Sequence, residues 1–436
     1  MTRYNPMREL PAPAGYTTGD VLVLFGELFG RGYANGIVEE AKKRGMTVIG
    51  TTVGRRASDG KLRPLNSAEL AEAEALLGGT IVNVPLEAGF DMTEDDGGRS
   101  PIEQIKRVKP DAWDTVSIDW GGIEQSRRNG VSRFTDAVAR LAAVLEKRIP
   151  PGANVLFVHS MAGGMPRARV YMPLFNRVFK GQGERFLSSE SFWNSELGKL
   201  CALNFDEVTA DTFRHLIDAT ASLRERTAAG GGRISYAAYG YHGTEVLING
   251  TYTWQSYIPY LPGWSKMRLE DVASAARQRG IEATVFNSPE IQTNSSALFL
   301  GVEISLYPLL AALEREGGAV YHAISAECQA LLKEGVTLEK LLAGANAYLG
   351  SHLIAGFRDF DGWPQHNTLE QAEYMLDCAT ELLGMNANPR EIVCAVLSRA
   401  VFTGVGRLMI DASWHAAAPV FWLNHDIIAQ RLGAQA

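Results

Sequence analysis

Cysteine is scarce in this chain of 436 residues, which has four thiols at Cys201, Cys328, Cys378 and Cys394. No two of them form a C-x-x-C pair, so the sequence indicates neither a disulfide framework nor a cysteine-based metal site. The eight histidines are scattered and none lies in an H-E-x-x-H motif, so we predict no metal centre. Scattered, reduced thiols are typical of a cytoplasmic protein, and that is the location we expect.

Motifs and charge patterns of other function classes are also missing. There is no G-x-S-x-G motif, which a serine hydrolase of the α/β type carries around its nucleophile. The 42 Lys and Arg residues are outnumbered by 49 Asp and Glu residues, and the net charge is −7. Phosphate backbones are bound by clustered basic surfaces, so we expect no nucleic-acid partner.

The chain also lacks a convincing membrane span. The best candidate, residues 297–313, is slightly short and contains Glu303 and Pro308, so we predict a buried helix there and no stable membrane insertion. The first twenty residues lack the apolar core of a signal peptide. With 46% hydrophobic and 21% charged residues, the composition is that of an ordinary globular protein.

What is present is an alternation of strands and helices. Residues 20–25 (DVLVLF) predict a buried strand, and glycines, a helix over 34–44 and a second strand over 46–53 complete a βαβ unit. Further strands are predicted at 114–119, 154–159, 233–241 and 283–287, and helices at 132–147, 206–226 and 266–278. This pattern is typical of a Rossmann-type, doubly wound parallel α/β sheet.

The remaining segments fit a single domain that spans residues 1–436. Its core covers 15–335, and a helical C-terminal extension without strands covers 336–436. Residues 54–115 are predicted to be a long surface insertion.

The sequence Gly26-Glu-Leu-Phe-Gly30-Arg-Gly32 lies between the first predicted strand and its helix. Glycines there permit a sharp turn and the close approach of a pyrophosphate to the helix N-terminus. The placement inside a βαβ unit therefore predicts a dinucleotide site at Gly26, Gly30 and Gly32.

The end of the second predicted strand normally meets the adenosine ribose of such a ligand. An acid there binds the 2′-hydroxyl of NADH, whereas arginine favours the 2′-phosphate of NADPH. Residues 51–56 (TTVGRR) contain no acid, so Arg55 and Arg56 favour NADPH over NADH, the alternative being that both are solvated loop residues. Asp119, Ser160, Met161 and Ala162 follow predicted strands and are further candidates for contacts with the cofactor.

Three tyrosines, Tyr252, Tyr257 and Tyr260, come shortly before Lys266. A tyrosine hydroxyl can polarise a carbonyl, and a nearby ammonium lowers its pKa and can bind the nicotinamide ribose. Spacing alone does not distinguish this catalytic pair from ordinary core and surface neighbours.

Eight residues separate Tyr257 from Lys266, within Thr253-Trp254-x-x-Tyr257-x5-Gly263-x-x-Lys266. This segment resembles the FabV-type trans-2-enoyl-ACP/CoA reductases of the short-chain dehydrogenase/reductase superfamily, which carry Tyr-x8-Lys in place of Tyr-x3-Lys. Upstream, residues 239–245 (YGYHGTE) are similar to the family's Y-x-Y-x-G-T-E stretch, which implies a second active-site tyrosine at Tyr241.

The resemblance extends to the cofactor site. The glycine turn matches, Ser160-Met161-Ala162 is similar to the family's Ser-Leu-Ala, and residues 293–297 (TNSSA) resemble its threonine-led cofactor loop, which implies contacts from Thr293 and Ser296. Two departures stand out: the family's glutamate after the second strand is Gly54 here, and the last hundred residues match nothing in the family.

The resemblance implies NAD(P)H-dependent reduction of the C2=C3 bond of a trans-2-enoyl thioester on CoA or acyl carrier protein. Tyr257 and Tyr241 would stabilise the enolate, and Lys266 would bind the ribose, in a monomer or homodimer. A carbonyl reductase or alcohol dehydrogenase that uses the same Tyr/Lys pair remains an alternative, as does a nucleotide-sensing protein without turnover.

Overall fold

The computed structural model describes residues 4–58, 62–161, 189–240, 243–256, 263–293, 301–354 and 366–434. Its centre is a seven-stranded sheet in the order β11-β10-β7-β6-β1-β2-β5, and all neighbouring strands are parallel. The strand order reverses between β1 and β6, the place where such sheets bind ligands, so the predicted Rossmann-type fold is confirmed. The strands are β1 Val21–Phe25, β2 Thr47–Thr52, β5 Thr80–Pro85, β6 Val155–His159, β7 Ile234–Gly240, β10 Ala283–Asn287 and β11 Val420–Trp422.

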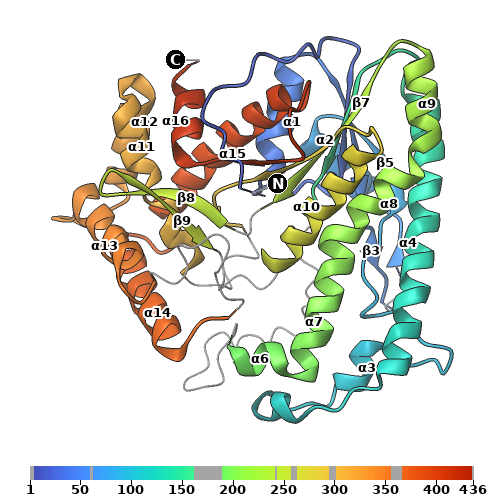
Figure 1. The fold of residues 1–436 in the computed structure, drawn as a ribbon, viewed down its shortest axis with the longest axis horizontal. Helices are drawn as coiled ribbons and strands as arrows, with labels where there is room; N and C mark the ends of the chain where they lie inside the picture. The colour runs from blue at the N-terminus through green and yellow to red at the C-terminus, as the bar shows by residue number, and fades with distance from the viewer. Residues whose placement is uncertain are drawn as a thin grey trace.

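The central strands are apolar on both faces because helices cover both sides of the sheet. In β1, Leu22 and Leu24 contact one hydrophobic core, while Val21, Val23 and Phe25 contact the other. The second core is closed by α4 (Trp120–Arg148), α8 (Thr212–Ala219), α9 (Ala221–Ala229) and α10 (Gly263–Gln278), which lie together on one side in Figure 1.

The first core is closed by α1 (Ala34–Lys43) and by helices from the C-terminal part of the chain. The predicted helical C-terminal extension is therefore packed against the Rossmann core and shares its apolar interior (Figure 1). The helices that follow β10 are η4 Val302–Leu306, α11 Leu309–Glu316, α12 Gly318–Ala330, α13 Leu338–Gly350, α14 Leu369–Gly384, α15 Val393–Ala412 and α16 His425–Gly433.

Helices α1 and α15 cross at backbone contact. A Cβ on Gly36 would lie 1.8 Å from the carbonyl oxygen of Phe402, and one on Gly406 would lie 2.2 Å from the carbonyl carbon of Gly36. At the other end of α1, Arg44 forms a 2.8 Å ion pair with the buried Asp411 of α15. Within the described residues α15 alone is long and apolar enough to cross a membrane, but 72% of it is buried inside the protein.

The predicted strand over residues 114–119 is wrong. A 3-10 helix, η1 (Pro110–Thr115), occupies its first part, and Asp119 is the N-cap of α4, where its side chain accepts a hydrogen bond from the backbone N–H of Gly122. Pro110 starts the 3-10 helix, and the aspartate favours a helix N-terminus over a strand end. The predicted helix over 132–147 is the second half of α4.

Both edge strands of the sheet were missed. Strand β5 lies in the expected surface insertion, after α2 (Ser67–Leu77), and β11 lies in the extension expected to have no strands. Strand β11 has three residues, and its outer edge pairs with the N-terminal segment, where the backbone N–H of Met7 donates to Trp422. The helix expected over 297–313 is divided, since α11 begins only after Pro308.

Outside the main sheet, β8 (Gly243–Ile248) and β9 (Thr251–Ser256) form an antiparallel hairpin. Asn249 and Gly250 connect the strands, both with positive φ, and an Asn-Gly pair is a strong hairpin signal. The buried Glu245 of β8 joins this hairpin to the N-terminal segment by accepting two hydrogen bonds from Arg8 and to the C-terminal part by accepting one from Asn424.

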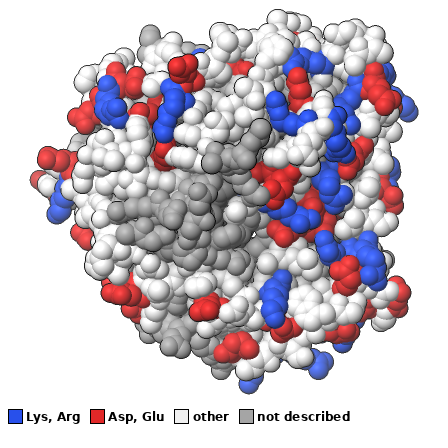
Figure 2. Space-filling model, in the orientation of Figure 1, with Lys and Arg blue, Asp and Glu red and all other residues white. Residues whose placement is uncertain are grey.

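The remaining elements lie in the lower and right-hand parts of Figure 1. Figure 2 shows basic and acidic side chains interspersed on the side of α4, as expected for a surface of neighbouring ion pairs. These elements are β3 Arg55–Arg56, β4 Leu62–Arg63, α3 Pro101–Ile105, α6 Glu190–Asn194, α7 Glu196–Asp206 and the π-helical turn η2 Glu207–Asp211.

Candidate active site

The glycine turn lies at the carboxyl ends of three adjacent strands. Gly26, directly after β1, has φ +132°, and a Cβ there would lie 2.3 Å from the Oγ of Ser160, which follows β6. The backbone N–H of Gly26 donates to the Oγ1 of Thr51 on β2, whose hydroxyl donates back to the carbonyl of Gly26, both at 2.9 Å. Glycine is therefore required at position 26 by the fold itself.

Gly30 and Gly32 differ from Gly26 in this respect. Their φ angles are not positive, and a Cβ on either would meet no atom within 4 Å among the residues that the structure describes. The turn is held in shape by Asn35, whose side-chain amide donates to the carbonyls of Phe29 and Gly32. In the part of the chain that the structure describes, the N-cap residue of α1, Tyr33, makes no side-chain capping hydrogen bond. Open space before a helix N-terminus suits an anionic ligand that approaches the backbone closely.

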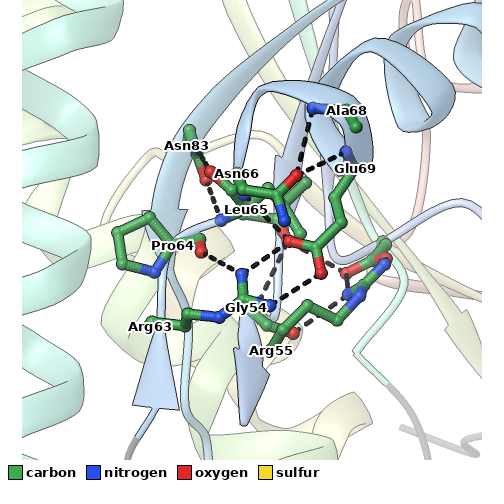
Figure 3. A network of polar contacts seen from close by, with 11 residues as sticks. Gly54, Arg55, Arg63, Pro64, Leu65, Asn66, Ala68, Glu69 and Asn83 are labelled. Carbon is green, nitrogen blue, oxygen red and sulfur yellow. Dashed lines mark hydrogen bonds and ion pairs between the residues drawn. The ribbon is translucent and has the colours of Figure 1, made fainter. Parts of the chain in front are cut away.

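The two arginines at the end of β2 are both paired with carboxylates. Arg55 forms two hydrogen bonds with Glu27 of the glycine turn, at 2.6 and 3.1 Å, and Arg56 forms an ion pair with Glu87. Figure 3 shows the neighbouring Arg63 held in the same way by Glu69 of α2. We expected Arg55 and Arg56 either to bind a phosphate or to be solvated loop residues. Their ion pairs with Glu27 and Glu87 were not predicted.

The other predicted cofactor residues are only partly where the sequence analysis expected them. Asp119 does not follow a strand: its side chain is 52% exposed and pairs with Arg99, which removes the reason for expecting it to contact the cofactor. Ser160 and the buried Met161 follow β6 as expected, and Thr293 is half-buried in the segment after β10. Ala162, Ser296, Tyr241 and Tyr257 lie outside the described residues.

Lys266 lies on the first turn of α10 and is buried. Its Nζ donates to the carbonyl of Tyr239 on β7 at 2.9 Å. The Tyr239 ring stacks on Tyr33, which follows the glycine turn, and the Tyr239 hydroxyl donates to the Tyr33 carbonyl at 3.2 Å. The structure thus brings Lys266 and the glycine turn together through two residues, although 234 positions separate Gly32 from Lys266 in the sequence.

The helices predicted over 206–226 and 266–278 are present, but sequence reasoning missed the π-helical turn between α7 and α8 and its contacts with α10 and β6. The buried Asp211, the last residue of the π-helical turn η2, accepts hydrogen bonds from Arg268 of α10. The next residue, Thr212, donates to the carbonyl of Val208, so its oxygen accepts a 2.8 Å hydrogen bond from the Nε2 of His159 at the end of β6. π-helical turns often mark functional sites, but no periodicity in the sequence indicates one.

His159 is fully buried, and burial, followed by the nearby Lys266 charge, holds its pKa well below the usual range. The imidazole is therefore neutral, with its proton on Nε2 as the bond to Thr212 requires. Burial likewise lowers the pKa of Lys266 to about 7. A lysine in this range is typical of functional sites, where side chains are buried beside a ligand.

Comparison with known proteins decides the family. The model of the enoyl-acyl carrier protein reductase FabMG matches residues 3–432. The apo structure of FabMG, one of the novel types of enoyl-acyl carrier protein reductase, is 49% identical, covers 100% of this chain and 99% of its own, and has a TM-score of 0.94. The chain belongs to the FabMG family.

A second FabMG structure, with NADH bound, is 42% identical over 100% of both chains and has a TM-score of 0.80. Among curated proteins the comparison finds no significant match. FabMG membership confirms the prediction of an NAD(P)H-dependent oxidoreductase that reduces an enoyl thioester. The finer resemblance to the FabV type stays a prediction.

In this FabMG family member the buried Lys266 has a cost in stability that depends on pH. Because burial lowers its pKa from 10.5 to about 7, the unfolded chain binds more protons than the folded protein between these values. The free energy of unfolding therefore rises with pH across that window, and the full cost is present below it. We expect Lys266→Met to be more stable than the wild type at about pH 6, by about 2 kcal/mol, and this gain to shrink towards about pH 10.

Thermal unfolding of both proteins over this pH range measures the difference. The matched control is Lys199→Met, which removes an exposed lysine paired with Glu196 and should leave the pH dependence unchanged. Parallel pH profiles of the wild type and Lys266→Met would contradict the assignment of a lowered pKa to Lys266.

Proposed function

We propose that this protein reduces the C2=C3 bond of a trans-2-enoyl group carried on acyl carrier protein, with NADH as the electron donor. The observation that carries the proposal is the connection of the buried Lys266 to the glycine turn through Tyr239 and Tyr33. This arrangement supports the proposal, because a nicotinamide dinucleotide would need a cation for its ribose close to the turn that binds its pyrophosphate. The NADH-bound FabMG relative supports the choice of ligand.

The residues at the glycine turn fit such a cofactor. Among the described residues, a Cβ on Gly30 or Gly32 would meet no atom within 4 Å, and the N-cap residue of α1 makes no side-chain capping hydrogen bond. A pyrophosphate bound there would be stabilised by the backbone N–H groups of the helix N-terminus. Lys266 would hold the nicotinamide ribose, and the segment after β6 would adjoin the cofactor at Ser160 and Met161. When bound, NADH supplies the hydride that the β-carbon of the substrate accepts.

The protein's own part in the reaction is to stabilise charge on the thioester oxygen. We propose that Tyr257, assisted by Tyr241, donates hydrogen bonds to this oxygen as the enolate forms, the point at which preorganised donors contribute most. Lys266 keeps the tyrosine acidic by its positive charge. Tyr257 or a water molecule then donates a proton to the α-carbon.

The choice of NADH over NADPH follows from the arginine pairs. The sequence expectation of NADPH rests on Arg55 and Arg56, and Glu27 and Glu87 already neutralise these two side chains. A 2′-phosphate would have to displace one of these carboxylates or lie next to it, which costs Coulomb energy.

Gly32→Ala tests the glycine turn. Since a Cβ at this position meets no described atom within 4 Å, the variant should keep its stability within about 0.5 kcal/mol but lose about tenfold or more in NADH affinity. Thermal unfolding and fluorescence titration with NADH measure the two effects. Gly26→Ala is the contrasting variant, because its Cβ would meet Ser160, so it should lose stability as well. Unchanged NADH affinity in Gly32→Ala would remove that glycine from the site.

The function itself is tested by following the oxidation of NADH and NADPH with crotonyl-acyl carrier protein, crotonyl-CoA, ketones and aldehydes. We expect NADH to be consumed with the carrier-bound enoyl substrate and not with ketones or aldehydes. Turnover of ketones without turnover of enoyl thioesters would replace the proposal by a carbonyl reductase. Tight NADH binding with no turnover of any substrate would indicate a nucleotide-sensing protein.

A further inference from the structure

A carboxylate from the glycine turn, that of Glu27, lies at the end of β2. Glu27 belongs to the glycine turn after β1, and its Oε2 accepts hydrogen bonds from the Thr52 hydroxyl at 3.0 Å and the Val53 backbone N–H at 3.1 Å. The side chain is only 5% exposed. A carboxylate is therefore fixed at the place where the ribose of a dinucleotide meets the second strand, although residues 51–56 contain no acid.

The same carboxylate holds the nearest arginine. The guanidinium of Arg55 forms a bidentate pair with Glu27 and also donates to the Gly54 carbonyl at 2.9 Å. Its side chain is 38% exposed, so the guanidinium lies at the protein surface rather than inside the core. In Figure 3 Arg55 lies beside Arg63, which has its own partner in Glu69.

The hydrogen bonds of Glu27 among the described residues do not use its full acceptor capacity. Its Oε2 accepts from Thr52, Val53 and Arg55, whereas its Oε1 accepts only the 2.6 Å bond from Arg55 among the hydrogen bonds of the described residues. A carboxylate oxygen has two lone pairs, so Oε1 can also accept a hydrogen bond from a hydroxyl. A 2′-phosphate is mostly a dianion at neutral pH, so it has little tendency to donate a hydrogen bond to the carboxylate and would be repelled by it.

We propose that Glu27 determines the coenzyme selectivity of this protein. Its carboxylate accepts a hydrogen bond from the 2′-hydroxyl of NADH, and its ion pair with Arg55 prevents that arginine from binding the 2′-phosphate of NADPH. This inference rests on the proposed function, because it needs a dinucleotide at the glycine turn. The FabV-type reductases have a glutamate after the second strand, where this chain has Gly54. In this protein Glu27 of the glycine turn would take the place of that glutamate.

The test is equilibrium binding of NADH and of NADPH to Glu27→Gln, measured by calorimetry without any acyl substrate. Glutamine keeps the shape of the side chain but removes the charge, so NADH affinity should fall about tenfold and NADPH affinity should rise about tenfold. The double variant Glu27→Gln/Arg55→Met should lose the gain in NADPH affinity. Glu69→Gln is the matched control, since it removes the same charge from the adjacent Arg63 pair and should leave the ratio of the two affinities unchanged.

If Glu27→Gln does not fold, Arg55→Met alone gives the answer, because it leaves the carboxylate without its partner and should increase the preference for NADH. A ratio of affinities within twofold of the wild type in the folded variants overturns the role of Glu27, as does a wild type that prefers NADPH. In the first case the proposed function stands as a whole. In the second case the reduction of the enoyl group stands, and the choice of NADH as the electron donor falls. A wild type that binds neither coenzyme overturns this role and the proposed function together.

Discussion

Replacing Tyr257 with phenylalanine is expected to lower kcat for the enoyl thioester about a hundredfold or more. The loss of one preorganised donor to a developing oxyanion has this effect, because the donor acts more strongly on the transition state than on the substrate. The NADH affinity should remain within about twofold, since Lys266 keeps its bond to Tyr239 and the glycine turn is unchanged.

Steady-state kinetics with a carrier-bound enoyl substrate, together with NADH titration, separates these two effects. The matched control is Tyr252→Phe, from strand β9 of the hairpin in the same segment. The Tyr252 hydroxyl accepts a hydrogen bond from Arg315 of α11, and this variant should leave kcat unchanged. Near-normal turnover of Tyr257→Phe would assign the oxyanion donor to another residue, and Tyr241→Phe would then be the next variant to measure.

Much of the fold was predictable because its central strands carry a strong local signal. Strands β1, β6, β7 and β10 are apolar runs buried on both faces, and the glycine turn between β1 and α1 has the expected place in a βαβ unit. The edge strands carry a weaker signal. Strand β11 has three residues and β5 contains an asparagine and a proline, so only pairing with neighbours distant in sequence reveals them.

The site could be predicted only where a local motif marks it. Gly26, Gly30 and Gly32 follow a pattern, and Tyr257 and Lys266 have the Tyr-x8-Lys spacing of the FabV-type reductases, so their pairing stays a prediction. The pair of Glu27 and Arg55 has no such pattern, because side-chain reach rather than spacing brings a turn residue across to the next strand. The contact of His159 with Thr212 depends on a π-helical turn that shifts the register of the helix, so it was equally invisible.

Gly36→Ala is expected to destabilise the protein by about 3 kcal/mol, although alanine normally stabilises a helix interior relative to glycine. The added Cβ would lie 1.8 Å from the Phe402 carbonyl of α15, which is backbone and has no rotamer to change. The two helices would have to separate, and the tight contact between Gly36 and Gly406 would be lost. Thermal or urea unfolding of the variant measures this cost.

The consequence for function follows from the position of α1. Its N-terminus carries the glycine turn, so a displaced α1 also displaces the turn, and Gly36→Ala should lose NADH affinity even below its unfolding temperature. Gly384→Ala is the matched control: this glycine ends α14, a Cβ there meets no described atom within 4 Å, and its substitution should be neutral or slightly stabilising. If Gly36→Ala unfolded like the control but still bound NADH poorly, the contact would matter for the geometry of the site and not for the stability of the fold. If both properties stayed at the wild-type level, α15 would have moved away without cost, and the C-terminal helices would not be the support that holds the coenzyme turn in place.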